Sequence, residues 1–291
     1  MPICEKINKD RETMELTEAT LTELKKIEIA MLREFVNVCD QLKLRYYLLG
    51  GTLLGAVRHQ GFIPWDDDID VGMLREDYEI FLQKGAALLP EHLFIQTNQS
   101  DPGYVHCFAK IRNSNTTFVE ISARKMNIHH GVFIDIFPLD FYPDDAGERR
   151  KFDWSRKWYE HRISVVFDLP GNYTLKGVVK KCLTKILLPS LQAAIEKRDA
   201  LYQKVPVSSM IANYGGAWGK KEIVPASWYG KGAKVMFEGM ELSAPAEYDK
   251  WLTQVYGDYM QLPPVEKRVG HHYVEAADLH APYTQYMRNR K

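Results

Sequence analysis

Four aspartates fall within five positions of this sequence, at Asp66, Asp67, Asp68 and Asp70. Carboxylates this close repel one another, so they stay ionised only if a divalent cation binds them or water surrounds them. Apolar residues alternate with them over residues 69–73, which is typical of a strand. Asp68 and Asp70 would then share one face, about 7 Å apart, which is close enough to bind one or two metal ions.

A pair of glycines lies upstream, between a predicted strand at 46–49 and a predicted helix at 52–58. Gly50 and Gly51 would let backbone amides approach a ligand, and Thr52 could donate its hydroxyl to a phosphate at the helix N-terminus. A glycine pair alone is usually a turn, and aspartate clusters are often solvated loops. The combination of strand, glycine pair, helix and D-x-D strand predicts a functional site.

These motifs resemble those of a known family. The segment GGTLLGAVRHQGFIPWDDDIDV, at 50–71, resembles the LicD family of the nucleotidyltransferase superfamily. The segments HGVFIDIFPLD, at 130–140, and YGDYMQLPPVEKR, at 256–268, resemble two further family blocks. The resemblance spans most of the chain without a departure at the motif positions. It implies an α/β (α+β) fold, with a nucleotidyltransferase-like mixed β-sheet flanked by helices.

The resemblance also implies a third metal-binding carboxylate, Asp135, on a neighbouring strand. Asp135 lies in the otherwise apolar run 132–137, where a buried charge needs a partner. A metal shared with Asp68 and Asp70 would supply one, and a salt bridge is the alternative. Mg²⁺ is the expected cofactor, although Mn²⁺ accepts the same oxygen ligands. Asp140 is predicted to be a turn residue or helix cap.

Further residues are candidates for contact with a substrate. Lys110 and Arg112 alternate on a predicted strand, where they could neutralise a diphosphate or pair with acidic neighbours. Trp65 could hold a quaternary ammonium by a cation–π interaction, or simply pack the loop. The substrate-binding candidates are Gly50, Gly51, Thr52, Arg58, His59, Trp65, Asp66, Asp67, Lys110, Arg112, Lys267 and Arg268. The catalytic and metal-binding candidates are Asp68, Asp70 and Asp135.

Composition favours a soluble globular protein of one or two domains. The chain has 291 residues, of which 45% are hydrophobic, and its 38 acidic residues equal its 38 basic residues. Zero net charge gives no support for nucleic-acid binding. Four scattered cysteines favour a reducing compartment. No apolar run approaches the ~20 residues of a membrane span, and no signal-peptide core is visible. We expect a cytoplasmic protein, with peripheral contact at the inner face of the membrane left open.

Hydrophobic periodicity predicts how these residues are positioned. We expect helices at 16–42, 52–58 and 75–88, and strands near 46–49, 69–73, 93–96, 105–112, 116–120 and 132–137. Region 1–143 would form the core with the metal site. Region 144–291 would be mainly helical, with helices at 146–166 and 175–203, and would complete the substrate cleft. The basic stretch at 175–188 could rest on an anionic membrane, but a core-facing amphipathic helix is favoured.

The family resemblance suggests a reaction. It implies transfer of phosphocholine from CDP-choline to a hydroxyl of a cell-surface glycan or its lipid-linked precursor, such as lipopolysaccharide or teichoic acid, with release of CMP. The donor could instead be another CDP-alcohol, carrying ribitol or glycerol. True nucleotidyl transfer, which releases pyrophosphate, is an alternative because the same carboxylates serve both reactions. A non-catalytic choline or glycan binder is disfavoured, since clustered carboxylates destabilise a protein that does not need them.

Overall fold

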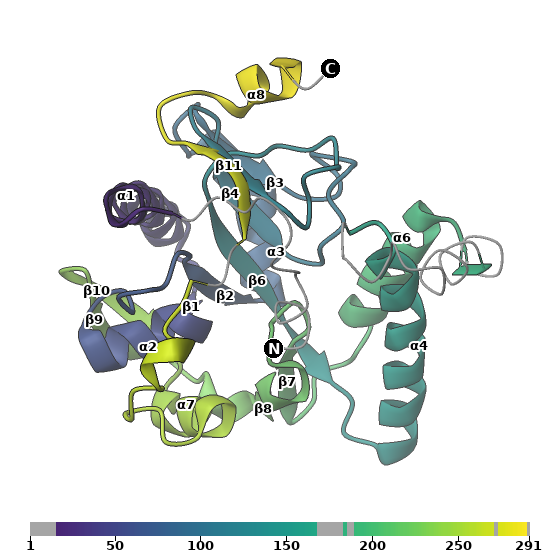
Figure 1. Cartoon of the computed structure of the whole chain (residues 1–291). Coiled ribbons are helices and arrows are strands. Elements are labelled where there is room, and N and C mark those ends of the chain that lie inside the picture. Colours follow the sequence, from purple (N-terminus) through teal and green to yellow (C-terminus); the bar gives the residue numbers. More distant parts are fainter. Residues whose placement is uncertain (1–15, 168–182, 185–188, 271–272, 290–291) are drawn as a thin grey trace.

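A seven-stranded mixed sheet forms the centre of the molecule (Figure 1). The computed structural model describes residues 16–167, 183–184, 189–270 and 273–289. The strands of this sheet are β1 (Tyr47–Leu48), β2 (Asp70–Leu74), β3 (Leu93–Gln96), β4 (Ala109–Asn113), β6 (Phe133–Tyr142), β7 (Met210–Asn213) and β8 (Ile223–Pro225). Their order is β1-β2-β6-β4-β3, with β7 pairing with β6 and β8 with β7. The prediction of a mixed sheet flanked by helices is confirmed.

Strand β6 is the longest strand and joins the others. It runs parallel to β2 and antiparallel to both β4 and β7. Residues 133–136 of β6 pair with β4, whereas residues 139–142 pair with β7. Asp140 lies inside this strand, buried, and its carboxylate forms a two-pronged ion pair with Arg75. This corrects the expectation of a turn or cap, which rested on the nearby proline alone.

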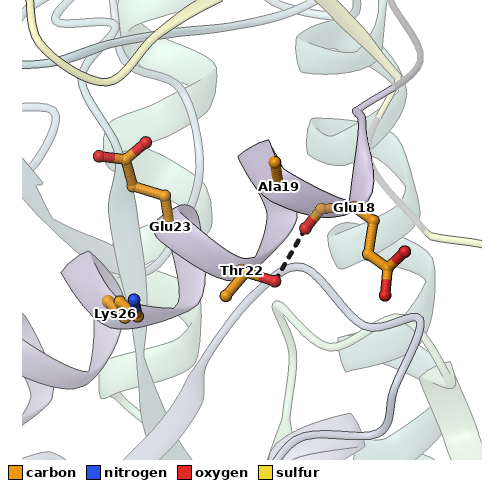
Figure 2. A pocket seen from close by; sticks show the side chains of 5 residues that line it. All are labelled: Glu18, Ala19, Thr22, Glu23 and Lys26. Carbon is orange, nitrogen blue, oxygen red and sulfur yellow. Dashed lines mark hydrogen bonds between the residues drawn. The ribbon is translucent and has the colours of Figure 1, made fainter.

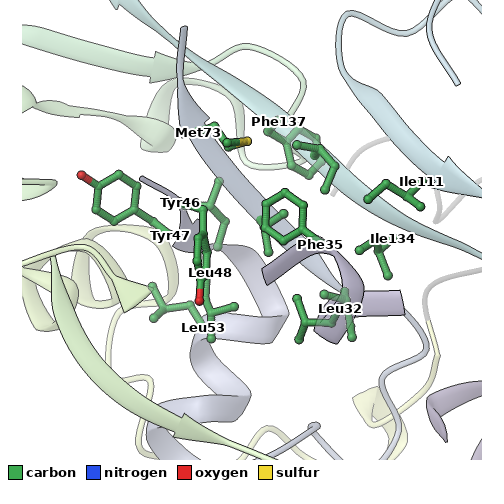
Figure 3. Packing of buried hydrophobic residues seen from close by; sticks show 14 of the residues in the cluster. Leu32, Phe35, Tyr46, Tyr47, Leu48, Leu53, Met73, Ile111, Ile134 and Phe137 are labelled. Carbon is green, nitrogen blue, oxygen red and sulfur yellow. The ribbon is translucent and has the colours of Figure 1, made fainter. Parts of the chain in front are cut away.

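Helix α1 (Glu18–Leu42) packs one apolar face on the sheet, as predicted. The hydroxyl of Thr17 accepts a hydrogen bond from the Thr20 N–H and caps the helix N-terminus. Leu32 and Phe35 of α1 enter the core beside Tyr46, Met73 and Ile134 (Figure 3). Helices α2 (Gly50–His59) and α3 (Arg75–Lys84) follow β1 and β2 respectively. The glycine pair therefore begins α2, Asp66, Asp67 and Asp68 lie just before β2, and Asp70 is the first residue of β2.

The second half of the chain contains more strand than expected. Helices α4 (Ala146–Ser164) and α6 (Leu191–Gln203) pack together, and α7 (Tyr248–Tyr256) and α8 (Tyr283–Asn289) follow. Besides β7 and β8, the strands β9 (Ala233–Phe237) and β10 (Met240–Ala244) form a hairpin, and β11 (Val274–Asp278) pairs with β5 (Thr117–Glu120). Helical residues still outnumber strand residues in this half, in line with the expectation, and the strands went unpredicted because each is only three to five residues long.

Short 3₁₀ turns complete the described structure: η2 (Gly85–Ala87), η4 (Gly219–Glu222), η5 (Ala226–Trp228) and η6 (Val265–Lys267). The predicted basic stretch at 175–188 lies outside the described residues, except for 183 and 184. Among the helices that the structure describes, none combines the length and the apolar character needed to cross a bilayer.

Candidate active site

Three neighbouring strands align charged residues at one level of the sheet. Asp70 of β2 lies opposite Asp135 of β6, and Asp135 lies opposite Lys110 of β4. The N–H of Asp135 donates to the carbonyl of Ile69 at 2.8 Å and fixes the two central strands at this level. Residues opposite one another in adjacent strands project to the same face. The fold thus brings the D-x-D strand together with Asp135.

Asp66, Asp67 and Asp68 form a compact group just before β2. One carboxylate oxygen from each lies within 4.8 Å of the others, and Asp66 and Asp67 are buried. Asp70 and Asp135 are not part of this compact group. The negative charge of Asp68 nevertheless helps to raise the pKa of both, so Asp68, Asp70 and Asp135 share one electrostatic environment.

The surroundings of Asp70 and Asp135 disfavour the ionised form of their carboxyl groups and so raise their pKa values. Burial raises the pKa of Asp70 well above its ordinary value, and the charges of Asp68 and Asp135 raise it further. Burial raises the pKa of Asp135 to about 6, although the Lys110 ammonium opposes the shift. The Oδ1 atom of Asp135 is buried, and the Lys110 ammonium lies 3.0 Å from it. Carboxylates that gather in one site and raise one another's pKa form an oxygen donor set suited to a hard divalent cation, so the residues present fit Mg²⁺ or Mn²⁺.

Lys110 contacts protein groups rather than solvent. Its Nζ atom lies 3.0 Å from Oδ1 of Asp135 as an ion pair, and its hydrogen bond is to Oδ2 at 3.5 Å. The same atom lies 3.7 Å from Glu120 and 3.2 Å from the ring centroid of Phe133. The side chain is almost fully buried. Lys110 is therefore placed to orient Asp135.

Arg112 is also directed into the protein. Its Nε donates to Oε1 of Gln96 at 2.8 Å, its Nη1 donates to the carbonyl of Gly131 at 2.8 Å, and its Nη2 lies 3.4 Å from Glu120. The sequence left open whether Lys110 and Arg112 bind a diphosphate or pair with acidic neighbours. Their contacts favour the structural alternative.

The glycine pair makes room for carboxylates. Gly50 has φ +53°, and a Cβ atom there would lie 2.5 Å from Oδ2 of Asp70. A Cβ atom on Gly51 would collide with Oδ2 of Asp66. Thr52 is buried, and its hydroxyl accepts a hydrogen bond from the Asp70 N–H at 2.8 Å. These residues thus bring the carboxylates against the start of α2, a role that the sequence did not reveal.

The loop that precedes the aspartates is held from two sides. The Lys25 ammonium of α1 donates to the backbone carbonyls of Ile63 and Pro64 at 3.2 and 2.9 Å. From the β9–β10 turn, Oε1 of Glu238 accepts a hydrogen bond from the Phe62 N–H at 3.1 Å. Sequence reasoning missed Lys25 and Glu238, because no local spacing connects them to the loop.

The C-terminal block packs against this loop and α2. The Arg268 guanidinium lies 5.6 Å from the ring centroid of Trp65, so a protein cation approaches the ring predicted to hold an ammonium. Arg58 donates to the backbone carbonyl of Tyr259 at 2.8 Å. Gly270 packs against Asp67, because a Cβ atom there would lie 3.2 Å from Oδ2.

The remaining two candidates lie at the edge of this arrangement. His59 ends α2 beside Arg58, and burial lowers its pKa. Lys267 is exposed in η6. The role of both side chains in substrate binding stays a prediction.

A shallow hollow lies elsewhere, on the first turns of α1 (Figure 2). It is lined by Glu18, Ala19, Thr22, Glu23 and Lys26, and the Thr22 hydroxyl donates to the carbonyl of Glu18 at 2.8 Å. None of its lining residues is a candidate site residue. The hollow is therefore separate from the carboxylate site.

Sequence comparisons relate this chain to known transferases. Residues 43–173 match the family described as LicD/FKTN/FKRP, nucleotidyltransferase domain. The chain is 33% identical over 268 residues to the lipopolysaccharide cholinephosphotransferase LicD of Haemophilus influenzae, a match that covers 88% of this chain and 97% of the relative. It is also 51% identical over 45 residues to the ribitol 5-phosphate transferase FKRP of mouse and human, covering 16% of this chain and 9% of each relative.

Proposed function

Because the chain belongs to the LicD family, and matches a lipopolysaccharide cholinephosphotransferase over nearly its whole length, we propose that it transfers phosphocholine from CDP-choline to a glycan hydroxyl. The other product would be CMP. The observation that carries this proposal is the row of Asp70 and Asp135 on paired strands, with Asp68 beside them. Phosphoryl transfer depends on charge neutralisation and positioning more than on protein nucleophiles. A metal ion held by these carboxylates would supply both.

We propose that Asp68, Asp70 and Asp135 hold the metal. A bound Mg²⁺, or Mn²⁺ in its place, would neutralise charge on the transferring phosphorus and lower the pKa of the attacking hydroxyl. Lys110 keeps Asp135 oriented toward Asp70, and Thr52 fixes the start of β2 through the Asp70 N–H.

Residues at the edge of the site would bind the donor. The carboxylates of Asp70 and Asp66 lie against Gly50 and Gly51 at the start of α2, so the phosphates of the donor would bind there through the metal rather than on the helix N-terminus itself. Arg58 and Arg268 carry positive charge next to the carboxylate loop, so they are suited to the diphosphate of the donor. We assign the reaction to the cytoplasm, where CDP-activated donors and a reducing environment suit this chain.

A second candidate donor is CDP-ribitol. The local match to a ribitol 5-phosphate transferase favours it, because that match is 51% identical over 45 residues. CDP-glycerol and true nucleotidyl transfer would use the same carboxylates. Product analysis separates the reactions, since CDP-alcohols yield CMP and nucleotidyl transfer yields pyrophosphate.

The decisive experiment is a thermal-shift screen with CDP-choline, CDP-ribitol, CDP-glycerol and CTP, each with and without Mg²⁺. A ligand at one hundred times its Kd stabilises the native state by about 2.7 kcal/mol, which a melting curve resolves. We expect a Mg²⁺-dependent shift with CDP-choline and CMP release when a glycan acceptor is added. A shift with CTP alone would refute the proposal in favour of nucleotidyl transfer.

The Asp70→Asn variant sharpens this test. Removing a buried negative charge relieves repulsion, so the metal-free variant should melt at the same or a higher temperature than the native protein. It should also lose the Mg²⁺-dependent shift and at least about a hundredfold in turnover. Asp40→Asn on the exposed side of α1 is the matched control. Near-native turnover of Asp70→Asn would contradict the proposed metal site.

A further inference from the structure

Two tryptophans lie in the open on helix α4. Trp154 is 66% exposed and Trp158 is 41% exposed. Their rings stack on each other with centroids 5.5 Å apart and an interplanar angle of 20°. Tryptophan is usually highly buried, so a stacked exposed pair is a feature that needs an explanation. The pair forms part of the face of α4 directed away from α6.

Basic residues border the tryptophan pair on both sides. At about 100° per residue, Trp154 and Trp158 project within about 40° of each other around the helix axis. Arg150 and Lys157 lie on one side of this stripe and Lys151 on the other, and all three are exposed. The acidic residues of α4 project outside this arc. Lys151 forms an ion pair with Glu148 at the border of the arc, so the net positive charge of the face comes from Arg150 and Lys157.

This combination is suited to the surface of a bilayer. Tryptophan is enriched at membrane–water interfaces, where its ring is apolar and its N–H can bond to water or headgroups. Exposed lysine and arginine beside such rings attract anionic lipids. A protein partner would more often be met by a larger apolar patch with an uncharged centre.

We propose that this tryptophan-basic face, formed by Arg150, Lys151, Trp154, Lys157 and Trp158, docks the protein on an anionic membrane surface. Helix α4 lies at one side of the molecule, away from the hairpin β9–β10 (Figure 1). The tryptophans enter the headgroup layer, and Arg150 and Lys157 contact lipid phosphates. The docking does not depend on which alcohol phosphate the carboxylate site transfers.

The test is cosedimentation of the full chain with vesicles of phosphatidylcholine alone or of phosphatidylcholine and phosphatidylglycerol in equal parts. We expect binding to the anionic vesicles only, weakening with added salt. The double variant Trp154→Ala, Trp158→Ala should bind about tenfold or more weakly, because it loses the apolar contact. The double variant Arg150→Glu, Lys157→Glu should bind at least about twentyfold more weakly, since each cation contributes about fivefold.

A matched control keeps the test specific. The double variant Lys234→Glu, Met236→Ala changes an exposed cation and an exposed apolar residue on β9, and it should bind like the native chain. Thermal melts of all variants check that they fold. Native binding by both α4 variants, or no binding by the native chain, would overturn the proposal. A native dimer that the tryptophan variant converts to monomers, without vesicle binding, would also overturn it and assign the face to self-association.

Discussion

At the scale of single residues, Gly50 combines two demands that only glycine meets. Its φ of +53° lies in the left-handed region, and its missing side chain leaves space for the carboxylate of Asp70. Gly239 in the β9–β10 turn has φ +75° but no atom within 4 Å of a built Cβ. A substitution at Gly239 would therefore add backbone strain alone, whereas a substitution at Gly50 would add strain and also crowd the carboxylate of Asp70.

We predict that Gly50→Ala and Gly239→Ala each lose about 1–2 kcal/mol of stability, because an alanine is strained at positive φ. Only Gly50→Ala should also lose the Mg²⁺-dependent thermal shift, because its methyl group would displace Asp70. Melting curves with and without Mg²⁺ measure both effects. An intact Mg²⁺ shift in Gly50→Ala would show that the close approach to Asp70 is dispensable.

Glu222 gives the protein a pH dependence outside the carboxylate row. Burial raises its pKa to about 7, although the Trp218 N–H and the Asn213 side chain donate to it and oppose the shift. The folded state thus binds this proton more tightly than the unfolded chain. The resulting stability is complete below the ordinary pKa near 4.5 and is lost as the pH rises through about 7.

We predict that Glu222→Gln removes this loss. Relative to the native protein, the variant should gain on the order of 3 kcal/mol between pH 4.5 and 8, since each unit of pKa shift is about 1.4 kcal/mol. Urea unfolding at pH 5, 6, 7 and 8 measures the difference between the two proteins. A constant difference across this range would contradict the assignment.

Individual residues also show how far sequence reasoning reaches. The family resemblance pointed to Asp135, and its position inside an apolar run predicted a buried charge that needs a partner, which the structure shows to be Lys110. The partner of Asp135 within the protein could not be assigned, because strand register decides that Lys110 faces it. Glu222 and Lys25 carry no local signal, since their roles depend on distant backbone groups.

At the scale of elements, the carboxylate loop between α2 and β2 depends on its neighbours. Residues 66–69 have no regular secondary structure. Their order comes from β2 on one side and from the contacts of Lys25 and Glu238 on the other. Helix α1 thus serves the site as well as the core, because one face packs on the sheet and Lys25 reaches the loop.

We predict that Lys25→Met lowers stability by about 1 kcal/mol and raises the Mg²⁺ concentration for half-maximal stabilisation several-fold. The loss follows from two backbone carbonyls, those of Ile63 and Pro64, which lose their ammonium donor. The neighbouring exposed Lys26→Met is the matched control. Equal Mg²⁺ titrations for the two variants would rule out this positioning role.

Helices and strands with a clear hydrophobic periodicity could be predicted from the sequence. Short strands that form only because another strand pairs with them could not. Helix α1 and strand β2 have long or alternating apolar patterns that identify them. Strands β7, β8 and β11 span three to five residues each. Such segments become strands because a distant edge is available for pairing, which local sequence does not encode.

At the scale of the whole molecule, both halves of the chain build one structure. Strand β7 continues the antiparallel pairing along β6, and β11 covers the edge of β5. Glu120 at the end of β5 contacts both Lys110 and Arg112 beneath Asp135. Strands β6 and β5, which lie before residue 143, therefore need strands β7 and β11 of the later region to complete their pairing.

We predict that a chain ending at residue 143 lacks a cooperative thermal transition and elutes as aggregates, because the edges of β6 and β5 would be exposed. Circular dichroism melts and size-exclusion chromatography measure this. A sharp transition in the monomeric fragment would instead establish the first region as an autonomous domain.

The pairing of β11 with β5 also has a consequence for biosynthesis. Val274 lies opposite Glu120, so the ribosome must translate much of the chain between making the two partners. Until residues 274–278 leave the exit tunnel, β5 remains an open edge on the nascent polypeptide. Helix α1 and strands β1 to β6 can assemble early in translation, whereas closure over Glu120 waits for β11. The ion pairs of Glu120 with Lys110 and Arg112 are therefore covered only after most of the sheet has formed.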